Sequence, residues 1–312
     1  MMPPTTTTGR TPVARQDKRP DLGMKMMTST ADIHGAAALL QAGLLDEAID
    51  AQLLRVRAHP ADTMARHFLA ELMVAAGELT RADRQLDMIA DQAPEQAVGL
   101  AGFRQLIRAE QIRREVMTEG RVPDFLDTPP PAVAKALEAL VAIRAGRHAD
   151  AAAAVIEAET LRPRGAIEVN GGRVDDFRDA CDLTGPVLEL LTASGRCFWV
   201  PLERVRRLVF QAPRRLIDLI WRPVEIETEG GPDGMVFMPA IYALTADSED
   251  AALKLGRRTD WATGQGPGAP QAGPISGRGQ RCFLAGDELM PALELTEIRR
   301  LCPAAGSGEG AA

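Results

Sequence analysis

The chain has 312 residues, of which 46% are apolar and 25% are charged, and this length is sufficient for two domains that each bury a core. The formal charge is −7, with acidic and basic side chains mixed along most of the sequence, which argues against nucleic acid as a partner. The sequence has neither a run of about 18 apolar residues nor the apolar stretch of a signal peptide. We therefore expect a cytoplasmic protein with no membrane contact.

The first segment, residues 1–30, is rich in proline, threonine and charged side chains and has no apolar period. Such a composition buries too little apolar surface to offset the entropy of ordering, so it predicts a disordered segment. The glycine-rich stretch 264–279 and the tail 302–312 are predicted to be flexible for the same reason.

A repeat is present in the first half of the chain: two copies are displaced by 34 residues, and a third copy keeps the same internal spacing. Its three copies share a turn glycine, an alanine, a proline and a small residue before the glycine. These columns are Gly43, Gly77 and Gly146; Ala48, Ala82 and Ala151; Pro60, Pro94 and Pro163; and Ala36, Ala70 and Ala139. The period is that of tetratricopeptide repeats, in which small residues let two helices approach, glycine forms the turn and proline ends the second helix.

We expect residues 31–165 to form an α-solenoid of tetratricopeptide-like helical hairpins, with a degenerate repeat between Pro94 and Val133 where the glycine and alanine columns are missing. The first helix of each hairpin would line an inner groove that receives a peptide or a helix of another protein. The predicted groove residues are Leu40, Val74, Leu140 and Ile143. The alternative for each is packing against a neighbouring helix, since apolar residues at helical spacing are more often core than interface.

Residues 166–301 show a different pattern and predict a mixed, mainly antiparallel β domain with short helices. From about Val187 the helical period gives way to short β-rich runs at 196–200, 207–210 and 224–228. The glycine-rich turn 229–234 predicts a hairpin between the last of these runs and 235–242. Further elements are expected as helices at 214–221 and 248–256 and as strands at 281–285 and 292–298. The fold class is α+β, with two domains.

All three tryptophans, Trp199, Trp221 and Trp261, lie in the second half of the chain. A large ring in a small domain is usually a core anchor, and an interface is the alternative. We name Trp199 and Trp221 as candidate partner contacts.

Seven arginines lie between Arg196 and Arg222, a local excess of positive charge in an acidic protein. They predict either a guanidinium patch for an acidic partner or charges that are dispersed over several faces and paired with carboxylates. We favour the dispersed arrangement, because successive side chains of a strand point to opposite faces. Arg206 is the candidate partner contact from this segment.

Catalytic groups are scarce in this sequence. The histidines all fall in the first half, at His34, His59, His67 and His148, so the second half has none to act as a general base or metal ligand. The four cysteines form no C-x-x-C pair and are predicted to be plain buried thiols. No phosphate-binding glycine loop is present.

One acidic cluster, formed by Asp175, Asp176 and Asp179, has the carboxylates that a magnesium site needs. The alternative is an exposed or helix-capping acidic turn, which we favour. We expect no cofactor, no metal and no enzymatic activity.

Five segments in the second half, taken in order, resemble the ImpE/TagJ family. They are 176–191 (DFRDACDLTGPVLELL), 195–210 (GRCFWVPLERVRRLVF), 213–223 (PRRLIDLIWRP), 250–261 (DAALKLGRRTDW) and 277–281 (GRGQR). The resemblance extends from about Ile33 to Ile298. Members are accessory proteins of the bacterial type VI secretion system.

The resemblance implies a cytoplasmic protein that contacts the small subunit of the contractile sheath (TssB) through a helical segment. It would thereby influence sheath assembly or sheath recycling by the ClpV unfoldase, and it carries over no catalytic residue. Our hypothesis is a non-enzymatic, sheath-binding adaptor. Two alternatives stay open: a tetratricopeptide scaffold for another protein partner, and a metal-dependent hydrolase or transferase that uses Asp175, Asp176 and Asp179.

Overall fold

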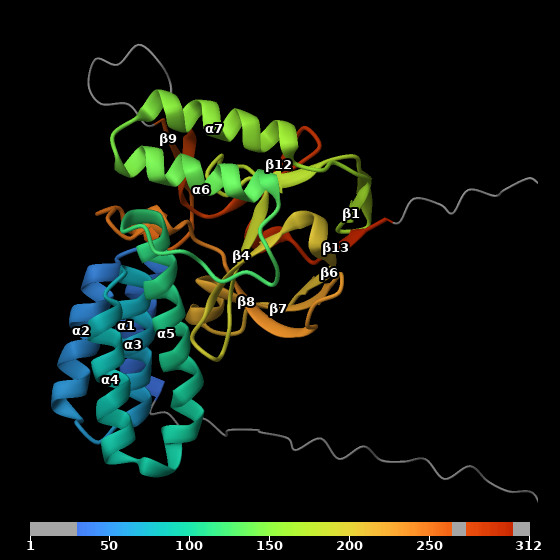
Figure 1. Cartoon of the computed structure of the whole chain (residues 1–312). Coiled ribbons are helices and arrows are strands. Elements are labelled where there is room, and N and C mark those ends of the chain that lie inside the picture. The colour runs from blue at the N-terminus through green and yellow to red at the C-terminus, as the bar shows by residue number, and fades with distance from the viewer. Residues whose placement is uncertain (1–29, 264–272, 302–312) are drawn as a thin grey trace, which may run out of the picture.

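The computed structural model describes residues 30–263 and 273–301. The tail 302–312, residues 264–272 of the glycine-rich stretch and nearly all of the predicted disordered segment 1–30 lie outside the described residues. In the described part, seven helices precede the first strand (Figure 1). They are α1 (Thr30–Ala42), α2 (Leu45–Ala58), α3 (Thr63–Ala76), α4 (Leu79–Gln92), α5 (Ala97–Thr118), α6 (Pro131–Arg144) and α7 (His148–Leu161).

The repeat columns lie where their residue types predict. Gly43, Gly77 and Gly146 form the turns between paired helices with φ of 87°, 89° and 69°, a backbone region that favours glycine. Each repeat proline follows the end of the second helix of its pair. The small residues of the other two columns are at most 2% exposed: Ala36, Ala48, Ala70, Ala82, Ala139 and Ala151. They allow the close approach of the paired helices.

The degenerate repeat expected between Pro94 and Val133 is not a helical hairpin. A single helix of 22 residues, α5, occupies most of this stretch, because no turn glycine interrupts it before Gly120. The following segment runs alongside β5, where the Asp124 N–H donates to the Cys197 carbonyl oxygen at 2.9 Å and the Trp199 N–H donates to the Asp124 carbonyl oxygen at 3.0 Å. The chain here extends the sheet.

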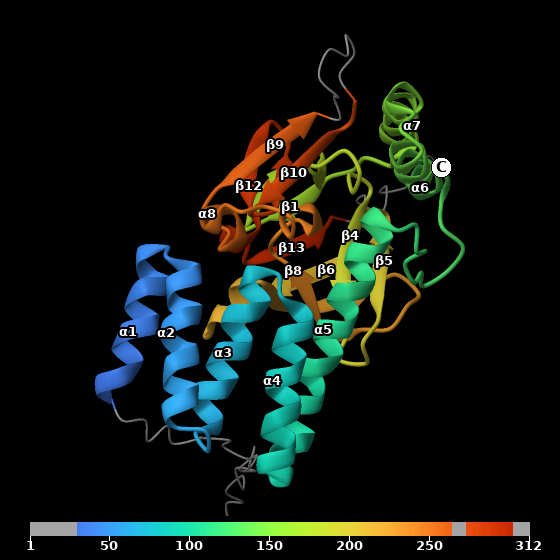
Figure 2. The ribbon, with the colours of Figure 1, turned by 90° about the vertical axis from the view of Figure 1, so that its left-hand side faces the viewer.

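Because α5 and the segment beside β5 replace a hairpin, the third predicted hairpin, α6–α7, is displaced from the others. Helices α1 to α5 form one layer, and α6 and α7 lie apart from it over one end of the β half (Figures 1 and 2). Leu140 of α6 and Ala154 of α7 share a core with Val187, Trp199 and Tyr242 of the β half. The continuous solenoid expected over residues 31–165 is therefore interrupted after α5.

The β half is built on an antiparallel eight-stranded sheet with the order β2-β1-β13-β6-β7-β8-β4-β5. Its strands are β1 (Ile167–Val169), β2 (Gly172–Val174), β4 (Val187–Leu191), β5 (Cys197–Pro201), β6 (Val205–Phe210), β7 (Trp221–Thr228), β8 (Gly234–Pro239) and β13 (Glu297–Arg300). A three-stranded sheet contains β3 (Phe177–Asp179), β11 (Cys282–Ala285) and β12 (Glu288–Pro291), and a two-stranded ribbon contains β9 (Thr259–Thr263) and β10 (Ile275–Gly279). The predicted α+β class is confirmed, as is the hairpin now formed by β7 and β8.

Several predicted elements differ from the observed ones. Strands β1 to β4 precede residues 196–200, where the sequence predicts the first strand. The helix predicted at 214–221 is only the 3-10 turn η3 (Leu216–Leu219), because Trp221 already pairs with Pro239 in the sheet and leaves too few residues to nucleate a helix. The second predicted helix shortens to α8 (Ala251–Lys254), and the strand expected at 292–298 divides into the turn η5 (Ala292–Glu294) and β13.

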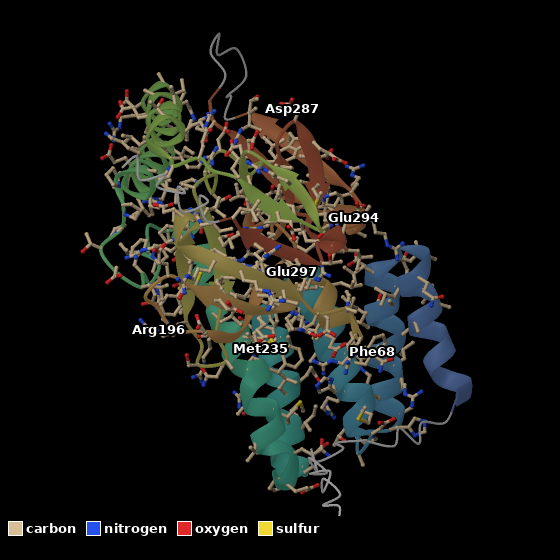
Figure 3. The ribbon with its side chains drawn as sticks, turned by 90° about the vertical axis from the view of Figure 1, so that its right-hand side faces the viewer. Phe68, Arg196, Met235, Asp287, Glu294 and Glu297 are labelled. Atoms are coloured by element: carbon tan, nitrogen blue, oxygen red, sulfur yellow. The ribbon has the colours of Figure 1, made fainter. Side chains whose placement is uncertain are left out.

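The two faces of the large sheet have different neighbours. On one face, side chains such as Leu208, Val224 and Met238 pack with Phe177 and Phe283 of the three-stranded sheet. The opposite face is divided. Its β4–β5 end packs against the helical layer, whereas the outward side chains of β6, β7 and β13 are half-buried or exposed (Figure 3).

Candidate partner-binding surfaces and a buried charge network

A network of buried charged side chains joins the helical layer to the sheet. We call it the charge network; its members are Glu110, Arg113, Asp179, Glu189 and Arg281, each at most 3% exposed. The Arg113 guanidinium on α5 donates to Glu110 at 2.8 and 2.9 Å and reaches Glu189 of β4 at 3.2 Å. The Arg281 guanidinium, next to β11, contacts Glu189 and places Nη1 3.1 Å from Asp179 Oδ2.

The environment of the charge network changes the pKa values of its members. Burial by itself would raise the pKa of Glu110, but Arg113 and Arg114 hold that pKa below its ordinary value. Burial keeps the pKa of Asp179 above its ordinary value in spite of Arg281. Burial opposes the charge of Arg281, yet Asp179 and Glu189 raise its pKa. The carboxylates and guanidinium groups of the charge network therefore neutralise one another, and these ion pairs connect α5 with the strands of the β half.

The three aspartates of the acidic cluster do not converge. The Asp175 side chain is 92% exposed, and Asp176 accepts two hydrogen bonds of 2.7 Å from Arg162. Asp179 points inward, where it accepts from Tyr242 Oη at 2.8 Å in addition to its contact with Arg281. Within residues 30–263 and 273–301, no three His, Cys, Asp or Glu side chains are placed to hold a metal ion together.

The four predicted groove residues lie in two separate places. Val74 of α3, 2% exposed, belongs to the core between the helical layer and the sheet, and Leu40 of α1 is half-buried against the same core. Leu140, 3% exposed, and the half-buried Ile143 belong to the core under α6 and α7. The structure therefore does not bring these residues together on one face, and their contact with a partner stays a prediction.

The inner side of the helical layer is covered by the chain itself. The segment around η3 packs on α3 and α5 through Ile217, Ile220 and Trp221, which are 4%, 8% and 1% exposed. Trp221 also donates from Nε1 to Glu110 Oε2 at 3.1 Å and meets the Phe103 ring edge-on at 6.1 Å. A partner helix could enter this groove only by displacing part of the β half.

The tryptophans that we named as candidates are both core residues here. Trp199 is 0% exposed and Trp221 is 1% exposed, which matches the alternative of core anchors. Trp261 is 40% exposed and lies with its ring 5.9 Å from that of Tyr242.

The arginines between Arg196 and Arg222 are dispersed, as favoured from the sequence. Arg196 pairs with Asp124 and Arg204 pairs with Asp127, both at 2.7 Å, while Arg222 is buried and donates to the Ala292 carbonyl oxygen. Arg206 of β6 is exposed, so it can reach a partner.

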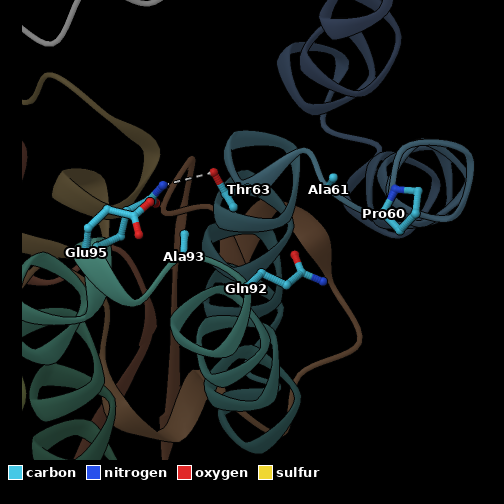
Figure 4. A pocket seen from close by; sticks show the side chains of 7 residues that line it. Pro60, Ala61, Thr63, Gln92, Ala93 and Glu95 are labelled. Atoms are coloured by element: carbon cyan, nitrogen blue, oxygen red, sulfur yellow. Dashed lines mark hydrogen bonds between the residues drawn. The ribbon is translucent and has the colours of Figure 1, made fainter.

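A hollow of about 560 Å³ lies at one end of the helical layer, between the α2–α3 turn and the α4–α5 connection (Figure 4). Its lining residues are Pro60, Ala61, Thr63, Gln92, Ala93, Glu95 and Gln96. The Gln96 amide donates to Thr63 Oγ1 at 3.3 Å. Glu95 is the single ionisable side chain of this lining, so the hollow lacks the paired groups that acid–base chemistry requires.

The half-buried His67 and the buried Glu71 of α3 lie side by side against η3. His67 Nδ1 lies 3.6 Å from Glu71 Oε1, and Arg215 Nη1 lies 3.7 Å from the same oxygen. Burial lowers the pKa of His67 to about 4, an effect to which Arg215 adds. Burial raises the pKa of Glu71 to about 7, against the opposing effect of Arg215.

The raised pKa of Glu71 predicts how the free energy of unfolding changes with pH. Because the folded state holds the Glu71 proton up to about pH 7 and the unfolded state releases it near 4.5, the stability contribution of Glu71 falls as pH rises between these values. The unfolding free energy of Glu71→Gln minus that of the wild type should therefore increase by about 3 kcal/mol when the pH rises from 5 to 8. The difference between variant and wild type cancels the opposite contribution of His67.

Urea unfolding of both proteins at several pH values measures this difference. Glu95→Gln, at an exposed carboxylate, is the control. A difference for Glu71→Gln that stays constant from pH 5 to pH 8 would contradict the prediction.

The charge network was not identified from the sequence, although one signal for it was present. Glu189 stands between apolar residues in the strand VLELL, and a charged side chain in a fully buried strand requires a buried partner. The partners could not be named, because Arg113 and Arg281 are 76 and 92 residues away along the chain.

Comparison with known proteins places this arrangement in a family. Residues 171–299 match the family described as ImpE protein. The type VI secretion system accessory component TagJ of Pseudomonas aeruginosa is 34% identical over 245 residues, which are 77% of this chain and 84% of TagJ. A crystal structure of a protein from Vibrio parahaemolyticus superimposes with a TM-score of 0.79 at 26% identity, covering 86% of this chain and 98% of that one. No helix among the described residues is long and apolar enough to cross a membrane. The chain belongs to the ImpE/TagJ family.

Proposed function

We propose that this protein is a cytoplasmic, non-enzymatic accessory adaptor of a type VI secretion system that binds the small, TssB-like subunit of the contractile sheath. Through that contact it would modulate sheath assembly, or sheath recycling by the ClpV ATPase. The observation that carries the proposal is the 34% identity to an accessory component of that system, which extends over 77% of the chain and so includes both helices and sheet.

The use of the charged side chains supports an adaptor. The strongly buried carboxylates, Glu110, Asp179 and Glu189, are each bound by arginines. An adaptor needs a rigid scaffold with exposed surfaces, and such a network connects the elements of a scaffold. The helical hairpins with their repeat columns are also a type of structure that often binds protein segments.

Binding to the purified small sheath subunit of the same secretion system tests the proposal. We expect saturable binding in isothermal titration calorimetry, with an affinity on the order of micromolar, as is usual for regulated contacts. The large sheath subunit alone is the control. If the small subunit is neither bound in titration nor retained by the immobilised full-length chain, the proposal fails.

The second candidate, a tetratricopeptide scaffold for another partner, is favoured by the repeat columns alone. It predicts binding to a protein outside the sheath and none to the small subunit. The same titration therefore separates the two candidates.

A further inference from the structure

One half of a sheet face is left uncovered by the helical layer. The outward side chains of neighbouring strands meet there in register: Glu297 lies opposite Val209, Val209 opposite Glu225, Glu225 opposite Met235, Arg207 opposite Glu227, and Pro223 opposite Phe237. We call this set the open face. None of its side chains is fully buried.

The open face contains an apolar corner next to the helical layer. Met235 is 53% exposed, and beside it Pro223 and Phe237 are half-buried. Phe237 packs against the same core as Phe68 of α3, and Figure 3 shows Phe68 and Met235 on this side of the molecule. Exposed apolar side chains that continue a buried core mark a place where further apolar surface can be added.

Acidic side chains border this corner. The open face has three carboxylates, on Glu225, Glu227 and Glu297, and one guanidinium, on Arg207. Beyond Arg207 the same side of the sheet continues to Arg299, whose charge is balanced by Glu168 at 2.9 Å. Arg207 pairs with Glu297 at 2.7 Å and with Glu227 at 3.5 Å. Glu225 is exposed, and in the part of the chain that the structure describes it forms no ion pair. The excess charge is therefore negative and lies directly beside Met235.

Two other surfaces of the described residues are obstructed. The inner side of the helical layer holds Ile217, Ile220 and Trp221. The free edge of β5 is partly occupied by the bridge to Asp124. The open face offers apolar anchors and uncompensated charge together.

We propose that the open face is the docking surface for a basic amphipathic helix of the small sheath subunit, a proposal that rests on the proposed function. The apolar stripe of that helix covers Met235, Phe237 and Pro223. Lysine or arginine side chains along its border pair with Glu225 and Glu227, and complementary charge of this kind accelerates association and selects the partner. In the segment VEIET, the apolar residues Val224 and Ile226 then pack in the core, and Glu225 and Glu227 on the other face contact the partner.

Two variants of the full-length chain test the surface, in titrations with the full-length small sheath subunit. Met235→Asp should weaken binding by about tenfold or more, because it removes an anchor at the centre of the contact. The double variant Glu225→Lys/Glu227→Lys should weaken binding by a similar factor. Wild-type binding should also weaken as salt rises from low to high concentration, and binding by the double variant should lose that dependence.

Matched controls come from β12 in the three-stranded sheet. Leu289→Asp changes an apolar residue that is 47% exposed, and Glu288→Lys reverses an exposed charge. Figure 3 shows Asp287, which precedes this strand, far from Met235. Both controls should bind within about twofold of the wild type, and thermal melting should show that all variants fold.

The outcomes are distinguishable. Wild-type binding that is lost in the open-face variants and kept in the β12 variants supports the surface. Wild-type binding that all variants retain overturns the surface and leaves the adaptor function standing. Loss in the β12 variants with retention in the open-face variants also overturns the surface. Absence of wild-type binding overturns the surface and the adaptor function together.

Discussion

Replacing Arg281 with methionine should destabilise the protein by about 3–5 kcal/mol at pH 7, because it leaves buried carboxylates without their counter-charge. Arg281 is 0% exposed and contacts both Glu189 and Asp179, which are also 0% exposed. Methionine fills much of the volume, so the loss arises from the unpaired carboxylates and only to a small extent from a cavity.

The pH dependence of Arg281→Met provides a second readout. Burial already raises the pKa of Asp179, and without the guanidinium that pKa should rise further, so the folded variant binds more protons than the unfolded state below neutral pH. The destabilisation relative to wild type should therefore shrink as pH falls from 7 towards 5. Urea unfolding at each pH measures it.

Arg207→Met is the matched control for Arg281→Met. Arg207 also contacts two carboxylates, but its side chain is 41% exposed, so water replaces the lost pairing. The expected loss is at most about 1 kcal/mol. Equal losses in the two variants would show that the charge network contributes no more than a surface ion pair.

Truncating Trp221 to alanine should cost about 3–5 kcal/mol of unfolding free energy. The ring is 1% exposed and lies in the core that the helical layer and the sheet share, and its removal also takes a hydrogen-bond donor from Glu110. Trp221→Phe keeps most of the ring volume and loses the hydrogen bond, so it should cost less, about 1–3 kcal/mol. Trp261→Ala, at a residue 40% exposed, is the control and should cost least.

Because this core belongs to both halves, Trp221→Ala should shift the unfolding of both together. Far-ultraviolet circular dichroism follows the helices, and fluorescence from the two remaining tryptophans, Trp199 and Trp261, follows the β half. Coincident transitions at lower urea for both probes are expected. Destabilisation of one half alone would show that the shared core does not couple them.

The helices of the first two hairpins could be placed from the sequence because their determinants are local. A glycine with positive φ, an alanine at a helix crossing and a proline after the helix each act within a few residues, and the 34-residue period repeats them. The β7–β8 hairpin was predictable for the same reason, since alternation and turn glycines are also local signals.

The arrangement around α5 was not predictable in this way. Loss of the turn glycine predicts a degenerate repeat, whereas the chain forms one long helix and then a segment that pairs with β5. The helix at 214–221 failed similarly, because pairing of Trp221 with β8 outweighs a helical apolar pattern over eight residues.

The sequence by itself determined the α+β class, the positions of most helices, the family and the dispersed arginines. Only the tertiary structure decided which faces remain available to a partner. The inner side of the helical layer holds Ile217, Ile220 and Trp221, and a sheet face around Met235 and Glu225 is left uncovered by the helices. The physical reason is that burial depends on contacts between residues more than a hundred positions apart, such as Trp221 with Glu110, and a periodic pattern specifies which side of an element is apolar without naming what covers it.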